Sequence, residues 1–276
     1  MSSQKKTNIV FASTKEILNQ IVSDFMQRGL PVRRLSPLVA LLIWGNAWEG
    51  DSELCKNVCS YLLQNRRPDG GWVDCEDTAW SLFVLDYFYQ QASSCCLEKT
   101  RNWLLEERSG QGWGYARRDN PNIPISALVR ICCPLLADDP SATWLRRTWE
   151  QDLQSKYQLS YKAAWFLLGR GDTEEDRTLA LRTLRHLEQD QRKDGGWGPW
   201  REHYAPTDCF ATGIILSALG REPLAEGSQG EAMATKAIKW AQKICNESGL
   251  FPTHYIELNS AWMLNGLLSC SSRWQL

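Results

Sequence analysis

The chain has 276 residues, of which 43% are hydrophobic, and its formal net charge is −1. Nucleic-acid-binding proteins usually carry a surplus of basic residues, so this charge balance argues against DNA or RNA as a partner. The sequence has no run of about 18 uncharged apolar residues, and its polar N-terminus does not resemble a signal peptide. We therefore expect a cytoplasmic protein with no transmembrane segment.

The cysteines are expected to be reduced. Ten occur, mostly within apolar runs that read as helices. The adjacent pairs Cys95-Cys96 and Cys132-Cys133 lack the CxxC spacing of zinc ribbons and thioredoxin-like sites. Without an export signal, core thiols are favoured over disulfides.

Tryptophan is the compositional outlier, and its placement reveals a repeat. Trp72, Trp113 and Trp197 each follow a glycine in a turn between a charged amphipathic stretch and an apolar one. After each turn, a small or hydroxyl residue opens the apolar run. In chain order, the anchor residues of the six units are Ser36, Thr78, Ser126, Ala163, Thr212 and Ser260. Successive anchors are 37 to 49 residues apart, which is the length of a two-helix repeat.

The two helices of each unit differ in character. The first is amphipathic, and the second is apolar on almost every face, as in residues 214–219. The apolar stripe of the first helix comprises Ile17, Ile21 and Phe25 in the first unit, and Leu179, Leu181, Leu184 and Leu187 in the fifth. An amphipathic helix suits an outer ring and an apolar helix suits an inner ring. The pattern predicts an all-α fold: an N-terminal tail of residues 1–14, then a single (α/α)6 toroid over residues 15–276.

One mouth of this barrel is expected to carry unusual charge. Each inner helix begins just after its turn, so the residues one and two positions before each anchor should line the same end. Only the second unit has acids at both positions, Glu76 and Asp77, with Asp74 just upstream. These carboxylates could cap the helix, because helix N-termini favour negative charge. Alternatively, crowded carboxylates cannot all ionise, and one keeps its proton near neutral pH.

Two segments carry a resemblance to a known superfamily. Residues 191–197 match the pattern Q-x-x-x-G-x-W at every defined position, and residues 64–72 match it with two extra residues. This pattern resembles the QW repeat of squalene and hopene cyclases. Residues 74–79, D-C-E-D-T-A, resemble the D-x-D-D-T-A motif of class II terpene cyclases, with Glu76 in place of the middle aspartate. The chain is thus similar to the superfamily of terpenoid cyclases and protein prenyltransferase β-subunits.

The resemblance implies a class II-type terpene cyclase that protonates and cyclises a linear isoprenoid. Glu76 would be the general acid, with Asp74 and Asp77 as its supports. The carbocation that forms needs aromatic faces and the exclusion of water. The aromatic residues expected to bind substrate, at the mouth or on turns leading to it, are Tyr161, Phe210, Tyr115, Trp200 and Tyr204.

Basic residues on the turns and at the mouth suggest a second role. If the substrate carries a diphosphate, the residues expected to bind it are Arg33, Arg34, Arg117, Arg118 and Lys162. Mg²⁺ would enter only with such a diphosphate, and no other cofactor is expected. Arg34 or Lys162 could instead pair with Glu76 and Asp77.

No metal site is expected. Prenyltransferase β-subunits bind zinc through an Asp-x-Cys pair and a histidine at inner-helix starts. Here Asp208 and Cys209 are adjacent, and Asn259 occupies the histidine position, although His203 and His254 lie nearby in the sequence.

A non-catalytic protein is the principal alternative. Toroids and other repeat folds are common recognition scaffolds, so the mouth could bind a peptide, lipid or protein partner. Class II cyclases place the active site between two helical domains, and this chain has residues for one. A pocket at the mouth would therefore be open, closed by a homodimer, or completed by a partner domain.

Overall fold

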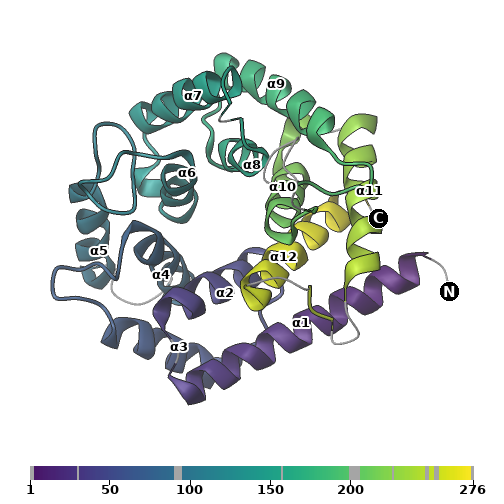
Figure 1. Ribbon diagram of the computed structural model, residues 1–276. Helices are drawn as coiled ribbons and strands as arrows, with labels where there is room; N and C mark the ends of the chain where they lie inside the picture. Colours follow the sequence, from purple (N-terminus) through teal and green to yellow (C-terminus); the bar gives the residue numbers. More distant parts are fainter. Residues whose placement is uncertain are drawn as a thin grey trace.

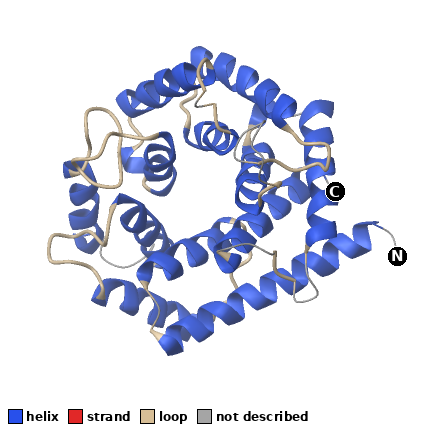
Figure 2. Cartoon of the chain, viewed as in Figure 1, coloured by secondary structure: helices blue, strands red, loops and turns tan. Residues whose placement is uncertain are grey.

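The computed structural model describes residues 3–29, 31–89, 95–156, 158–198, 206–225, 227–245, 249–251 and 255–274. Within these residues there are twelve α-helices, joined by loops and two short 3₁₀ turns, and no strand (Figure 2). The inner helices are α2 (Val32–Trp44), α4 (Cys75–Phe88), α6 (Ile123–Cys132), α8 (Ser160–Gly169), α10 (Cys209–Arg221) and α12 (Ile256–Trp274). The outer helices are α1 (Ser3–Arg28), α3 (Ser52–Gln64), α5 (Cys95–Glu106), α7 (Asp139–Leu153), α9 (Glu174–Asp190) and α11 (Ser228–Ile244).

The helices form two concentric rings, as predicted (Figure 1). Each inner helix packs against the next one in the chain, and α12 packs against α2, which closes the inner ring. The six helix pairs therefore make an (α/α)6 toroid. Helix α1 begins at Ser3 and continues to Arg28, so most of the segment expected to be a tail, residues 1–14, has helical backbone.

The hydroxyl anchors close the turns between the outer and inner helices. Thr212 Oγ1 accepts a hydrogen bond from the Trp197 backbone N–H at 3.0 Å, while the Trp197 indole donates to the Leu187 carbonyl near the end of α9 at 2.7 Å. Three further anchor hydroxyls accept in the same way, in the pairs Thr78 with Trp72, Ser126 with Trp113, and Ser260 with Phe251. Each hydroxyl satisfies a buried donor that the turn would otherwise leave without a partner.

The fifth turn also explains the glutamine and glycine of its pattern. Gln191 donates from its side chain to the carbonyls of Gly195 and Met233, both at 2.8 Å, and so ties the turn to α11. Gly195 has φ +108°, and a Cβ there would lie 2.4 Å from the Lys236 carbonyl oxygen. Only glycine fits this position without strain.

The inner helices run parallel, with their N-termini at one mouth. At their starts, Arg33 of α2 reaches Asp77 of α4. At their ends, Arg221 of α10 donates to the Trp44 carbonyl of α2 at 3.0 Å, and Arg130 of α6 donates to the Gly169 carbonyl of α8 at 2.6 Å. The predicted polarity of the barrel is therefore confirmed.

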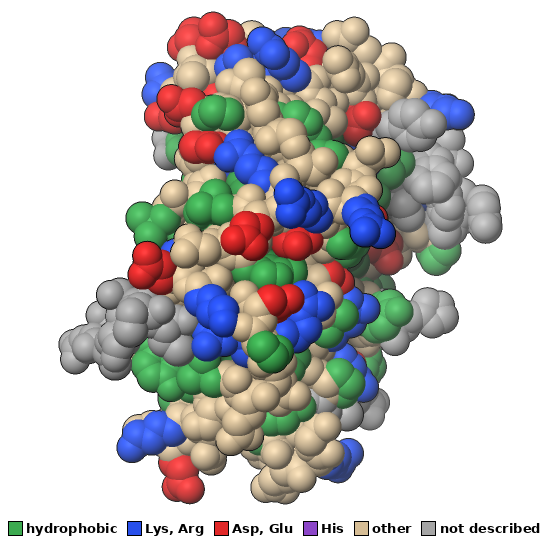
Figure 3. All heavy atoms as spheres, turned by 90° about the vertical axis from the view of Figure 1, so that its left-hand side faces the viewer, with side chains coloured by type: hydrophobic (Ala, Val, Ile, Leu, Met, Phe, Trp, Pro, Cys, Tyr) green, Lys and Arg blue, Asp and Glu red, His purple; other side chains and the backbone are tan. Residues whose placement is uncertain are grey.

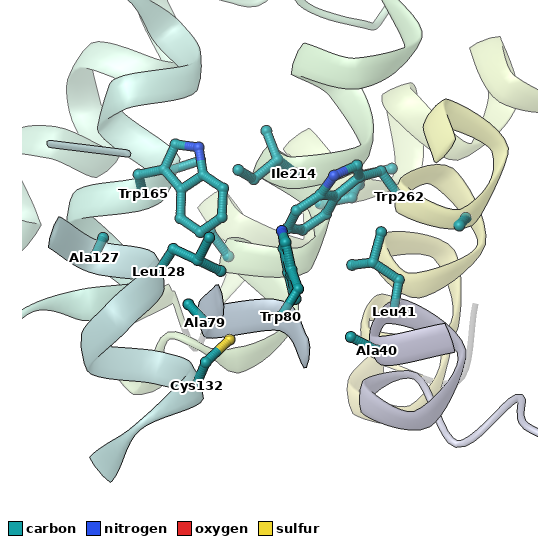
Figure 4. Close-up of a cluster of buried hydrophobic side chains, with 14 of the residues drawn as sticks. Ala40, Leu41, Ala79, Trp80, Ala127, Leu128, Cys132, Trp165, Ile214 and Trp262 are labelled. Carbon is teal, nitrogen blue, oxygen red and sulfur yellow. The ribbon is translucent and has the colours of Figure 1, made fainter. Parts of the chain in front are cut away.

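Aromatic side chains fill the barrel at mid-height. Trp262 is 2% exposed and lies edge-on to rings from four other inner helices, at centroid distances of 5.5 to 6.2 Å from Trp44, Trp80, Trp165 and Phe210. Figure 4 shows side chains from all six inner helices converging on this cluster. Such edge-to-face contacts are favourable because the positive ring edge meets the negative ring face.

The amphipathic outer helices largely follow the predicted pattern. Leu179, Leu184 and Leu187 of α9 are buried, but Leu181 is 43% exposed, so its assignment to the apolar stripe was wrong. Two residues after Leu179, Leu181 points about 200° away around the helix.

On the face shown in Figure 3, the described acidic and basic side chains are interspersed rather than gathered by sign.

Eight cysteines in the described residues form no disulfide, and burial raises the pKa of Cys75 and Cys270 to about 12, which keeps both protonated. The side chains of Cys95 and Cys96 lie outside the described set.

No helix in the described ranges is both long enough and apolar enough to cross a bilayer.

Candidate functional site

The three carboxylates surround the start of α4. Asp74 is the N-cap residue, and its side chain accepts the Asp77 backbone N–H at 2.9 Å. Asp208 caps α10 in the same way, and Asn122 caps α6. Capping is therefore a repeated feature of these units and accounts for Asp74. It does not account for Glu76.

Arg33 brings a positive charge to the two aspartates. Its Nε donates to Asp77 Oδ2 at 3.2 Å, and its Nη2 forms an ion pair with Asp74. Asp77 is only 2% exposed, whereas 58% of the Arg33 side chain is exposed. Burial raises the pKa of Asp77 to about 6, with a further rise from Asp74, although Arg33 opposes both.

Glu76 differs from its neighbours because it lacks such a partner. Within the described part of the chain, no hydrogen bond or ion pair reaches its half-buried carboxyl group. Burial raises the pKa of Glu76 to about 7, and the negative charges of Asp74 and Asp77 add to this rise, while Arg33 lowers it. A carboxyl group with a pKa near 7 carries a proton that it can donate at neutral pH.

Tyr115 is the aromatic residue nearest to these carboxylates by its interactions, although it is 48% exposed. The Tyr115 carbonyl accepts the Cys75 backbone N–H at 2.8 Å, and the pKa of Tyr115 is raised by burial and then by the charge of Glu76. Tyr161 also raises the pKa of Tyr115, and the Tyr161 ring lies 6.1 Å from that of Phe210. Phe210 in turn contacts the central tryptophan cluster. The other two aromatic residues predicted for the site, Trp200 and Tyr204, lie outside the described residues.

The expectation that Arg34 or Lys162 pairs with Glu76 and Asp77 was wrong. Arg34 forms an ion pair with Glu257 of α12, and Lys162 pairs with Asp152 at 2.7 Å. Successive helical residues point about 100° apart, so Arg33 faces α4 while Arg34 faces α12 on the other side of α2.

The remaining two predicted basic residues form no ion pair with the three carboxylates in the described part of the chain. Arg117 and Arg118 are exposed in the loop before α6. The Arg117 backbone N–H donates to Glu107 Oε2 at 2.6 Å. The structure therefore brings Arg33 and Tyr115 to the carboxylates of Glu76, Asp74 and Asp77, while Tyr161 packs against Phe210 and Phe210 against Trp262.

The described residues offer no metal centre. No group of three or more histidine, cysteine, aspartate or glutamate side chains among them could hold an ion. Asp208 is engaged as the cap of α10, and burial raises the pKa of Cys209 to about 12, which disfavours a thiolate ligand. His203 and His254 lie outside the described residues.

The sequence contained a signal for Arg33 as the partner of Asp77. Residues at similar offsets from their anchors lie at similar heights on neighbouring parallel helices. Arg33 lies three positions before Ser36, and Asp77 lies one position before Thr78. An arginine fork can span that difference of about 3 Å.

Comparisons with known proteins show what this fold is similar to. No family model matches the sequence, and no curated protein matches it. Among solved structures, type II terpene cyclase MstE from Scytonema in complex with geranylgeranyl dihydroxybenzoate has a TM-score of 0.66 at 12% identity, covering 98% of this chain and 99% of that one. An apo variant of the same cyclase has a TM-score of 0.68 at 12% identity, covering 99% and 100%.

A second group of structures shares the fold. A protein from Klebsiella pneumoniae, described as a possible member of the GH105 family, has a TM-score of 0.63 at 11% identity, covering 98% of this chain and 93% of that one. At these identities the likeness is one of fold alone. The chain has the α/α toroid fold found in terpene cyclases and in GH105-like proteins, and the choice between activities rests on the site.

Proposed function

We propose that this protein is a class II-type terpene cyclase in which Glu76 is the general acid. The observation that carries the proposal is the contrast within one cluster. Arg33 pairs with Asp74 and Asp77, whereas Glu76 has no such partner in the described structure and a pKa of about 7. A carboxylate that only caps a helix does not need a raised pKa. A general acid does, because it must hold its proton near neutral pH and then donate it.

The proposed reaction begins with proton transfer from the Glu76 carboxyl to a terminal carbon–carbon double bond or an epoxide. The π electrons of an alkene form the new C–H bond and leave a tertiary carbocation on the adjacent carbon. Another double bond of the same chain attacks this cation and closes a ring. Loss of a proton from a neighbouring carbon ends the sequence, so the product is an isomer of the substrate.

The surrounding residues fit this chemistry. The Glu76 carboxylate left after proton transfer lies near the Arg33 charge, which disperses the negative charge of the three-acid cluster. The rings of Tyr115, Tyr161 and Phe210 provide π faces that stabilise a cation.

The proposal also covers the substrate and the groups that would bind and enclose it. The substrate is a linear isoprenoid, and if it carries a diphosphate, Arg117 and Arg118 are candidates to bind it together with Mg²⁺. Trp200 and Tyr204 are further candidates for its aromatic lining. A homodimer or a partner domain would cover the mouth.

The buried tryptophans favour one competing function, a non-catalytic toroid that binds a partner at its mouth. Trp262 is buried and packs against Phe210, so a substrate that reaches past Phe210 to this position would have to displace these rings. A peptide or lipid that binds only at the mouth would need no such space.

Product analysis distinguishes the two functions. Wild-type protein, Glu76→Gln and the exposed control Glu98→Gln are incubated with geranylgeranyl diphosphate, squalene and geranylgeranyl dihydroxybenzoate, and products are identified by mass spectrometry. We expect a cyclic isomer from wild type and Glu98→Gln, and at least about a hundredfold less from Glu76→Gln. Absence of cyclic product from wild type, or full activity of Glu76→Gln, would contradict the proposal.

A further inference from the structure

A cavity lies at the end of the barrel opposite Glu76. Its volume is about 750 Å³. It is lined by the C-terminal ends of α2, α6, α8 and α10 and by the first turns of α7 and α9. Glu76 lies at the N-terminal mouth, and the contact of Trp262 with Trp44, which lines the cavity, places the tryptophan cluster between the two regions. The function of this cavity is therefore a separate question from the proposed cyclisation.

Three guanidinium groups line the cavity, and one of them is neutralised. Arg170 forms two hydrogen bonds of 2.8 Å with the carboxylate of Glu222. Arg130 instead donates to the carbonyls of Gly169 and Asp138, at 2.6 and 2.7 Å, and to the Ser141 hydroxyl.

Arg221 also donates to neutral acceptors. Its partners are the carbonyls of Ser217 and Trp44, at 3.2 and 3.0 Å, and the Ser269 hydroxyl. No ion pair with a carboxylate reaches Arg130 or Arg221 within the described residues. A guanidinium has five N–H donors, so each of the two arginines keeps N–H groups that these contacts do not use.

Besides Glu222, the lining carries the carboxylates of Asp139, Asp172 and Asp176. Asp139 and Asp176 act on Arg130 through their charge without forming an ion pair with it. Asp172 is exposed at the rim and pairs with Arg177 at 3.1 Å. Asp176 lies 3.5 Å from Arg146 and belongs to the capping box at the start of α9. Burial lowers the pKa of Arg221 to about 10, which reflects the cost of a cation with no adjacent anion.

We propose that this cavity binds a small organic phosphate, whose phosphate oxygens accept hydrogen bonds from Arg130 and Arg221. The N–H groups of a guanidinium match the oxygens of a phosphate in geometry and charge. The cavity is much larger than an inorganic anion, and its apolar lining includes Leu167 and Leu168. Trp44 also lines it, and the Arg221 guanidinium lies over the Trp44 ring at 4.3 Å. The organic part of the ligand packs against this apolar lining.

Calorimetric titration tests the proposal. The probes are inorganic pyrophosphate, ADP and geranyl diphosphate, which separate the anion alone from a nucleotide and from a prenyl group. We expect saturable binding of at least one organic phosphate, weakened about tenfold or more in Arg221→Gln and in Arg130→Gln. The control Arg185→Gln removes an exposed arginine of α9 and should change affinity by less than about twofold.

Arg130 and Arg221 also tie helix ends together, so a second variant keeps the test valid if their replacement prevents folding. Thr143→Trp fills the cavity from α7 without altering either arginine, and it should abolish binding. Glu76→Gln should bind as wild type does. The proposal is overturned if no probe binds, if Arg185→Gln weakens binding as much as Arg221→Gln, or if Thr143→Trp leaves binding intact.

Discussion

Arg33 on α2 and Asp77 on α4 are joined by a hydrogen-bonded ion pair of 3.2 Å that bridges the first two helix-pair repeats. Arg33 is mostly exposed and Asp77 is buried, so the arginine brings its charge to the acid from the solvent side of the mouth. The same charge lowers the pKa of Glu76. Arg33 therefore adjusts the acidity of the whole cluster.

Replacing Arg33 with glutamine should raise the pKa of Glu76 above about 7 and that of Asp77 above about 6, because a positive charge that favours both carboxylates is lost. NMR titration of the side-chain carboxyl carbons measures both values. Arg67→Gln removes an exposed arginine that pairs with Asp69 and serves as the control. Unchanged titration of Glu76 in Arg33→Gln would contradict the role given to Arg33.

Stability should fall as pH rises through the cluster's titration range. The pKa of Glu76 is about 7 in the folded protein and 4.5 as its ordinary value, so between these pH values the unfolded chain releases the proton first. Asp77 acts in the same direction between 3.8 and about 6. Glu76→Gln should therefore be more stable than wild type at pH 8, by on the order of 2 kcal/mol. Urea unfolding at pH 4 and pH 8 measures this difference, and an advantage that is the same at both pH values would refute the explanation.

Removal of the central ring should destabilise the barrel. Trp262→Ala deletes edge-to-face contacts with four aromatic rings and leaves a cavity on the axis, at a cost of about 3 to 5 kcal/mol. Leu135→Ala, at a residue that is 80% exposed, should be nearly neutral. Chemical denaturation compares the two variants. A loss below about 1 kcal/mol for Trp262→Ala would show that the axis is not close-packed.

The anchor hydroxyls should have a measurable energetic role. Thr212→Val keeps the shape of the side chain but leaves the buried Trp197 N–H without an acceptor, which costs about 1 to 3 kcal/mol. The same substitution at the exposed Thr178 of α9 supplies the control, with a change within about 0.5 kcal/mol. Thermal unfolding of both variants gives the comparison, and equal losses would rule out a specific role for the anchor.

The fold could be predicted from the sequence because each repeat unit is determined by residues that lie close together in the chain. Three turns combine a glycine, a tryptophan and a following hydroxyl, and Thr212 and Trp197 show that these residues contact one another directly. The polarity of the barrel followed from the same order of elements. These features depend on contacts between residues close in the sequence, and such contacts produce a recognisable sequence pattern.

Pairings across the ring were predicted less well. Arg33 was grouped with the residues expected to bind a diphosphate, and its ion pairs with Asp74 and Asp77 depend on how α2 is rotated against α4. A rotation of one residue would have presented Arg34 instead. The cavity beside Arg221 was not anticipated either, because its lining comes from six helices, α2 and α6 to α10, several of which are far apart in the sequence.

Deuterium incorporation tests the central claim most directly. If Glu76 donates the initiating proton, a cyclisation run in D₂O should place one deuterium on the carbon that was protonated, because the carboxyl group exchanges with solvent before each turnover. Mass spectrometry and NMR of the product should therefore show one added mass unit at that carbon for wild type, and Glu76→Gln should form no such product. Cyclic product without deuterium, or labelled product formed equally by Glu76→Gln, would contradict the assignment of Glu76 as the acid.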